Sequence, residues 1–207
     1  MMKLAALVGL ALFSVAPVLS ERTTWAYDCE GLYVVANHGR SGEITLFLPD
    51  RTLSLPAQPA ASGAKYGADG LSFWSKGESE ALLEQPGESP RRCSVDGRAS
   101  VREDAKLRGV HFRATGNEPG WVLELGPDAF RLYYDYGKSL AAFPPLEPKS
   151  NAEKRETVYV GETESHRIQI VIRGEECRDT MADDRFESTV MITLDGRELA
   201  GCGQALH

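Results

Sequence analysis

Short apolar or alternating runs recur along most of the chain and predict β-strands. They cover residues 32–36, 44–48, 53–55, 65–66 and 71–74, then 121–125, 130–134, 157–160, 168–172 and 190–194. Asp69-Gly70 and Asp195-Gly196 are hairpin-turn dipeptides, and the second turns the chain back towards residues 199–202. Because the runs are short and separated by glycine and proline rather than by helical patterns, an all-β protein with antiparallel strands is predicted.

One segment has a helical pattern. Ser100-Val101-Arg102-Glu103 has the form of a capping box with Ser100 as the N-cap, and Gly109 can end the helix. We interpret residues 95–109 as a linker with this short helix, between a first lobe of residues 21–94 and a second β lobe of residues 110–207. Residues 137–155 contain three prolines and are predicted to be a long, partly mobile loop.

The first 20 residues have the pattern of a secretory signal peptide. Lys3 precedes an apolar run over residues 4–18, and cleavage is expected near Ser20. The run is too short for a stable membrane span, and no later apolar stretch is long enough for one. No cysteine directly follows the run, so the lipobox of a lipid-anchored protein is absent. An exported protein without a membrane span is therefore expected.

Four cysteines in an exported chain indicate disulfides, and four allow three connectivities. Their spacing favours Cys29–Cys93 and Cys177–Cys202, one bridge in each lobe. Zinc is the rival interpretation, but no Cys-x-x-Cys pair occurs and the four histidines are scattered. We expect no metal and no cofactor.

The formal net charge of −7 disfavours nucleic acid as a partner, because nucleic-acid binding needs basic patches. An acidic protein suits a basic partner through electrostatic steering, although the same charge also serves solubility. The oligomeric state is not indicated by the sequence.

Two motifs lie between the first two cysteines: Ser62-Gly63-x-x-Tyr66 and Phe73-Trp74-x-Lys76-Gly77. With Tyr27-x-Cys29 before them and Leu82 and Cys93 after them, residues 25–93 resemble the periplasmic and membrane-bound inhibitors of c-type lysozyme from Gram-negative bacteria. Without a lipobox, the chain is similar to the periplasmic version.

This resemblance implies a small antiparallel β-barrel with a disulfide, and c-type lysozyme as the partner. It also implies a loop inserted into the lysozyme cleft, where Ser62 and Lys76 meet the two catalytic carboxylates. Gly63, Tyr66 and Gly77 are the other motif residues expected at the lysozyme-binding site. The chemistry is plausible in itself, because a lysine brings a compact cation with three donors and a serine adds a short donor.

Each motif also has a competing interpretation. Phe73 and Trp74 are expected to be core residues, since large aromatic side chains usually become buried. Ser62-Gly63-Ala64-Lys65 fits the S-x-x-K pattern of penicillin-binding proteins, but the S-D-N and K-T-G partner motifs are missing. We therefore expect an inhibitor rather than an enzyme. The alternative is an envelope ligand-binding or scaffold protein whose inhibitor-like lobe does not inhibit.

The second lobe resembles an uncharacterised domain of bacterial envelope proteins, through residues 112–121 and 177–183. Asn117, Glu118 and Trp121 form a polar-aromatic cluster that would suit a small ligand, but Asn-Glu-Pro-Gly is equally a turn signal, which we favour. Asp179, Asp183 and Asp184 lack the spacing of an EF-hand loop, so an acidic loop held by a disulfide is expected instead of a calcium site.

Overall fold

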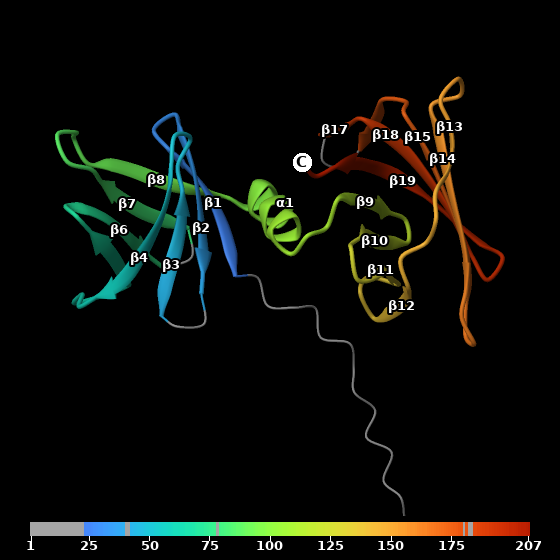
Figure 1. Cartoon of the computed structure of the whole chain (residues 1–207), viewed down its shortest axis with the longest axis horizontal. Coiled ribbons are helices and arrows are strands. Elements are labelled where there is room, and N and C mark those ends of the chain that lie inside the picture. The colour runs from blue at the N-terminus through green and yellow to red at the C-terminus, as the bar shows by residue number, and fades with distance from the viewer. Residues whose placement is uncertain (1–22, 40–41, 78, 180, 182–183) are drawn as a thin grey trace, which may run out of the picture.

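The computed structural model describes residues 23–207 except 40–41, 78, 180 and 182–183. Two β units lie on either side of one helix (Figure 1). The expected signal peptide lies outside the described residues. Among the residues that are described, no helix is long and apolar enough to cross a bilayer.

The first unit is a closed barrel of eight strands, each antiparallel to the next, and its last strand pairs with its first. The strands are β1 (Thr24–Cys29), β2 (Leu32–His38), β3 (Glu43–Phe47), β4 (Thr52–Gln58), β5 (Ala64–Ala68), β6 (Leu71–Lys76), β7 (Glu80–Glu84) and β8 (Arg91–Asp96). Alternate residues point inward and fill the interior, where the rings of Tyr27 and Phe73 meet edge to face with centroids 5.1 Å apart. The Cys29–Cys93 disulfide joins β1 to β8.

The helix α1 (Gly97–Leu107) begins earlier than the capping box predicts. Asp96 is the N-cap, and its side chain accepts hydrogen bonds from the backbone N–H groups of Arg98 and Ala99. Ser100 is fully buried within the helix instead, where its hydroxyl accepts a 2.8 Å hydrogen bond from the backbone of Ala26 in β1. The predicted capping box is therefore wrong, because the serine is used to fix the helix to the barrel.

The same helix also contacts the second unit. Both terminal nitrogens of Arg108, directly after α1, donate to the carboxylate of Glu124 at 3.0 and 2.9 Å. These bonds are the main cause of the raised pKa of Arg108. Ala105, Val110 and Leu206 form a small buried cluster beside this ion pair. Residues 95–109 thus contain more than a linker, since α1 is attached to both β units.

The second unit is a nine-stranded antiparallel sheet in the order β12-β11-β10-β9-β19-β18-β15-β14-β13. Its strands are β9 (Phe112–Asn117), β10 (Gly120–Leu125), β11 (Phe130–Tyr134), β12 (Ser139–Phe143), β13 (Lys149–Asn151), β14 (Glu156–Glu162), β15 (Arg167–Arg173), β18 (Ser188–Leu194) and β19 (Arg197–Ala205). The sheet curls around its own core, because Phe130 of β11 and Tyr159 of β14 are in ring contact at 5.2 Å although five strands separate them.

The all-β prediction is confirmed, with an antiparallel barrel, a second antiparallel unit and one helix. The predicted loop over residues 137–155 is wrong in part, because it contains β12 and β13, and Pro144, Pro145 and Pro148 lie between these strands. A two-stranded hairpin of β16 (Cys177–Asp179) and β17 (Asp184–Phe186) is tied to β19 by the Cys177–Cys202 disulfide. The two disulfides are the pairs that the cysteine spacing favours.

Candidate functional site

The motif residues of the first unit are organised around Trp74 on β6. Phe73 points into the barrel and is fully buried, whereas Trp74 is half-buried on the opposite, outer face of the same strand. The expectation that both aromatics belong to the core is therefore wrong for Trp74. Lys76 lies two residues further along β6, so strand alternation places it on the same outer face.

Trp74 contacts both residues that the resemblance singles out. Its indole N–H donates a 2.8 Å hydrogen bond to the backbone carbonyl of Ser62, in the loop between β4 and β5. The ammonium group of Lys76 lies 4.2 Å from the centroid of a Trp74 ring, within the range of a cation–π interaction. One indole thus holds the Ser62 loop and the Lys76 cation on one exposed surface.

Gly63 cannot be replaced without moving this loop. Its φ of +67° lies in the left-handed region, and a Cβ atom there would stand 2.2 Å from the backbone oxygen of Ser75. Gly77 also has a positive φ, +78°, but a Cβ atom added to it would meet nothing within 4 Å. The close approach of the loop to β6 therefore depends on Gly63.

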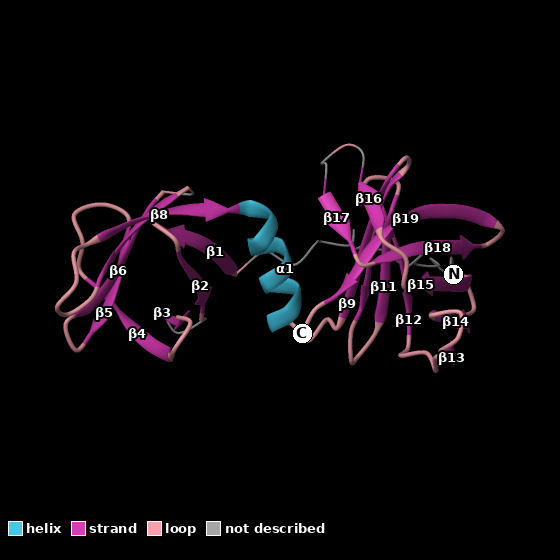
Figure 2. Ribbon diagram, turned by 90° about the horizontal axis from the view of Figure 1, so that it is seen from above, coloured by secondary structure: helices cyan, strands magenta, loops and turns pink. Residues whose placement is uncertain are grey.

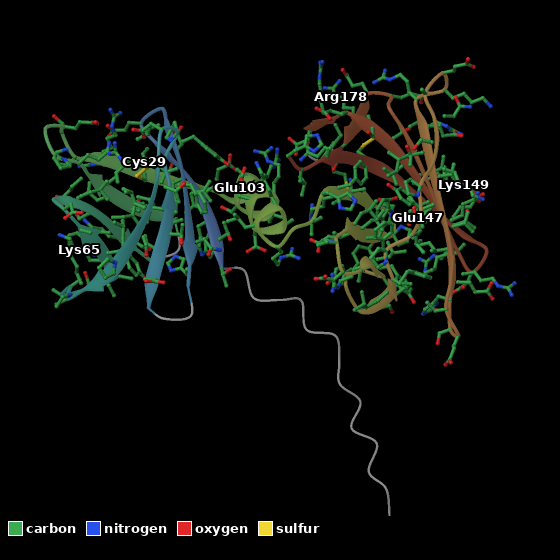
Figure 3. The ribbon with its side chains drawn as sticks, viewed as in Figure 1. Cys29, Lys65, Glu103, Glu147, Lys149 and Arg178 are labelled. Atoms are coloured by element: carbon green, nitrogen blue, oxygen red, sulfur yellow. A yellow bond between two sulfur atoms is a disulfide. The ribbon has the colours of Figure 1, made fainter. Side chains whose placement is uncertain are left out.

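A second cation lies beside Trp74. Lys65 is the cross-strand partner of Trp74, and its ammonium lies 5.9 Å from the ring centroid and 3.8 Å from the Glu84 carboxylate. Figure 3 shows Lys65 on the outside of the barrel. Ser62 precedes a strand rather than beginning a helix, so the S-x-x-K resemblance lacks the helical setting that its chemistry needs.

Tyr66 lies apart from this surface. It packs against the barrel core, opposite Phe73 in the hairpin, and its hydroxyl lies 3.4 Å from Nδ1 of His38. Burial lowers the pKa of His38. The ring of Tyr66 therefore packs on the inner face of the β5–β6 hairpin, while Ser62 and Lys76 face outward.

Lys76 also borders a cavity of about 480 Å³ on the barrel wall. Its lining includes three carboxylates, from Asp28, Glu30 and Glu80, together with the guanidinium of Arg92. The surface on this side of Lys76 is therefore acidic, and it suits contact with a cationic group of a partner.

The polar-aromatic cluster of the second unit does not form one site. Residues 117–120 make the turn between β9 and β10, as the turn signal predicts, and Trp121 is buried in the core of the sheet. Asn117 donates a 2.7 Å hydrogen bond to Asp179 of β16. Asp183 lies outside the described residues, and no cluster of three metal-ligating side chains occurs among the residues that are described.

Comparison with known proteins finds similarity in the first unit. Residues 27–92 match the family model of the membrane-bound lysozyme inhibitors of c-type lysozyme. A curated protein of Yersinia enterocolitica (serotype O:8 / biotype 1B), named membrane-bound lysozyme inhibitor of C-type lysozyme, is 38% identical over 61 residues. These residues are 29% of this chain and 52% of the relative, so the chain spans about half the length of that relative. No solved structure matches the chain.

The resemblance stated from the motifs is confirmed for the barrel by the match, which includes both motifs and all the residues around Trp74. Sequence reasoning missed the organising role of Trp74 and the presence of Lys65 beside it. The two-residue turn at Asp69-Gly70 carried the missing signal, because it fixes the register in which Lys65 stands opposite Trp74.

Proposed function

We propose that the protein inhibits c-type lysozyme in the bacterial periplasm, protects peptidoglycan from lysis, and has no catalytic activity of its own. The observation that carries the proposal is the double contact of Trp74, which binds the Ser62 loop and the Lys76 cation. The family match of the barrel gives the partner class, c-type lysozyme. The envelope location rests on the same match and on the leader pattern of residues 1–20.

The proposed contact is chemically complementary. A lysozyme cleaves its substrate between two carboxyl groups, at least one of which is ionised. We place the Lys76 ammonium against the ionised carboxylate and the Ser62 hydroxyl against the other carboxyl group. Because Trp74 already holds the Ser62 backbone and the lysine, less conformational entropy is lost when the partner binds.

The charge around the contact supports a basic partner. The net charge of −7 favours approach of a cationic protein, and the acidic cavity beside Lys76 lies next to the proposed contact. In this proposal Lys76 enters the lysozyme cleft, while Asp28, Glu30 and Glu80 meet cationic groups outside it. These three carboxylates lie at the rim of the proposed contact. They therefore act mainly on the association rate, which falls as the salt concentration rises.

Alanine substitution tests the proposed contact pair. Lys76→Ala should weaken binding by roughly 2–5 kcal/mol, because it leaves a buried carboxylate without its cation. Ser62→Ala should weaken it by about 1–3 kcal/mol, the cost of an unmade buried hydrogen bond. The measurement is the inhibition constant in a cell-wall lysis assay with a c-type lysozyme.

Lys149→Ala is the matched control, since Lys149 is an exposed lysine on β13 of the other unit (Figure 3). It should leave the inhibition constant unchanged. Full potency in both Lys76→Ala and Ser62→Ala would contradict the contact pair. Absence of inhibition by the unmodified protein would contradict the proposed function itself.

A further inference from the structure

A cleft of about 530 Å³ is lined by residues of α1, β9, β17 and β19. Figure 2 shows β9 and β17 on the side of the second unit that lies towards α1. Four arginines from three different elements line the cleft. They are Arg98 and Arg102 on successive turns of α1, Arg113 on β9 and Arg185 on β17. Like charges brought together repel, so such a cluster needs anions near it, and three carboxylates, from Asp96, Asp179 and Asp184, line the same cleft.

Arg113 is the deepest of the four, and it is incompletely paired. Its side chain is 22% exposed, and its Nε atom is buried without a hydrogen-bond partner. The Glu124 carboxylate is 3.7 Å from this atom, beyond hydrogen-bond distance, and both its oxygens already accept from Arg108. Arg108 is also bonded to Asp104. A buried N–H donor is thus left over at this position.

The carboxylates of the cleft wall already have other partners. Asp96 caps α1, and Asp179 accepts hydrogen bonds from Asn117 and from the backbone of Met181. Asp184 is ion-paired with Arg98 across the cleft. In these positions none of the three neutralises Arg113.

The arginines at the mouth can change partners. Arg185 is 71% exposed and lies 3.6 Å from the equally exposed Glu176, while Arg102 is 4.0 Å from Glu103. The Arg185–Glu176 pair is exposed on both sides and contributes little, so an incoming anion competes with it on nearly equal terms. Glu103 is only 17% exposed, but its distance of 4.0 Å from Arg102 is too long for a hydrogen bond. A planar guanidinium offers paired N–H donors that match the two oxygens of a carboxylate or phosphate group.

We propose that this cleft binds a small ligand through an oxyanion group, a carboxylate or a phosphate, with Arg113 at the floor and Arg102 and Arg185 at the mouth. The site is separate from the Trp74 surface and does not depend on lysozyme inhibition. It gives the second unit a ligand-binding role shared with the helix.

The test is a titration of the mature full-length protein, isotopically labelled, followed by NMR of the arginine Nε–H groups and the backbone amides. Inorganic phosphate and acetate are the two probes, and sodium chloride at matched ionic strength is the reference. We expect saturable shifts of Arg113 Nε–H and of the Gly97 and Gln204 amides, which border the cleft. The probe with the lower dissociation constant distinguishes phosphate from carboxylate recognition.

Substitutions make the result decisive. Arg113→Gln should raise the dissociation constant at least tenfold, and Arg102→Gln about threefold, while Arg167→Gln on the exposed side of β15 should have no effect. If Arg113→Gln does not fold, Arg102→Gln decides by itself, because that side chain is half exposed. Chemical-shift changes that do not saturate, or that sodium chloride reproduces, would overturn the proposal. It would also be overturned if neither Arg102→Gln nor Arg167→Gln altered these changes.

Discussion

The two β units consist of similar antiparallel hairpins but differ in closure. The barrel closes by pairing β1 with β8, whereas the nine-stranded sheet ends at β12 and at the three-residue β13. A closed barrel pairs all its strands with one another, so it has no open edge, and a partner contacts it through outward-facing side chains. The open sheet is instead connected to other elements. Its strand β19 is disulfide-linked to the β16–β17 hairpin, and the sheet borders the cleft at α1. We infer that the barrel and the sheet carry separate binding roles.

The largest expected difference between the units comes from their disulfides. The Cys29–Cys93 bridge closes 64 residues of sequence and Cys177–Cys202 closes 25. By the chain-entropy model, replacing each pair with serine should lower stability by about 4 and 3.5 kcal/mol respectively. Thermal unfolding with a lysozyme assay at each temperature is the measurement. Inhibition should be lost at a lower temperature only in the Cys29/Cys93 variant, and equal sensitivity of both variants would break the separation of roles.

The next effect concerns two glycines of the barrel. Gly63→Ala should lower stability and inhibition together, because it combines a left-handed backbone, at about 1–2 kcal/mol, with a clash against the Ser75 carbonyl. Gly77→Ala has the same backbone cost but open space around the new methyl group. Denaturant unfolding and inhibition constants of both variants isolate the effect of the clash. If the two variants behave alike, the close approach of the Ser62 loop to β6 is not what positions the site.

The smallest effect is a pH dependence confined to the barrel. Burial lowers the pKa of His38 below its unfolded value of about 6.5, so the folded barrel binds fewer protons than the unfolded chain. The stability contributed by neutral His38 is therefore present above pH 6.5 and declines as the pH falls below it. Unfolding free energies between pH 7.5 and 5 should show a shallower decline in His38→Gln. A parallel decline in both proteins would show that His38 does not contribute.

Much of the fold followed from local patterns. Alternation and turn dipeptides predicted the central strands, and cysteine spacing favoured both disulfide pairs. The helix start was mispredicted at Ser100 because a capping pattern is local, whereas that serine is used in a contact with Ala26 of β1, 74 residues away in sequence. The strand at residues 139–143 was missed because the prolines after it suggested a loop, although β12 pairs along its whole length with β11.

The candidate site was predictable in its residues but not in its organisation. The motifs gave Ser62 and Lys76, and strand alternation separates Phe73 from Trp74 without saying which of them faces inward. The bond from Trp74 to the Ser62 carbonyl depends on how the β4–β5 loop folds over β6, which no local pattern encodes. The arginine cleft was also missed, because its four arginines lie on three elements far apart in sequence and meet only through the packing of α1.

The most direct test of the central claim is inhibition by the separated units. One fragment contains residues 21–109, which keeps α1 on the barrel, and the other contains residues 109–207. We expect the first to inhibit a c-type lysozyme with the constant of the full chain, and to lose this activity with Lys76→Ala. The second fragment should fold and not inhibit. Inhibition found only in the full chain, or in residues 109–207, would contradict the assignment of this function to the Trp74 surface of the barrel.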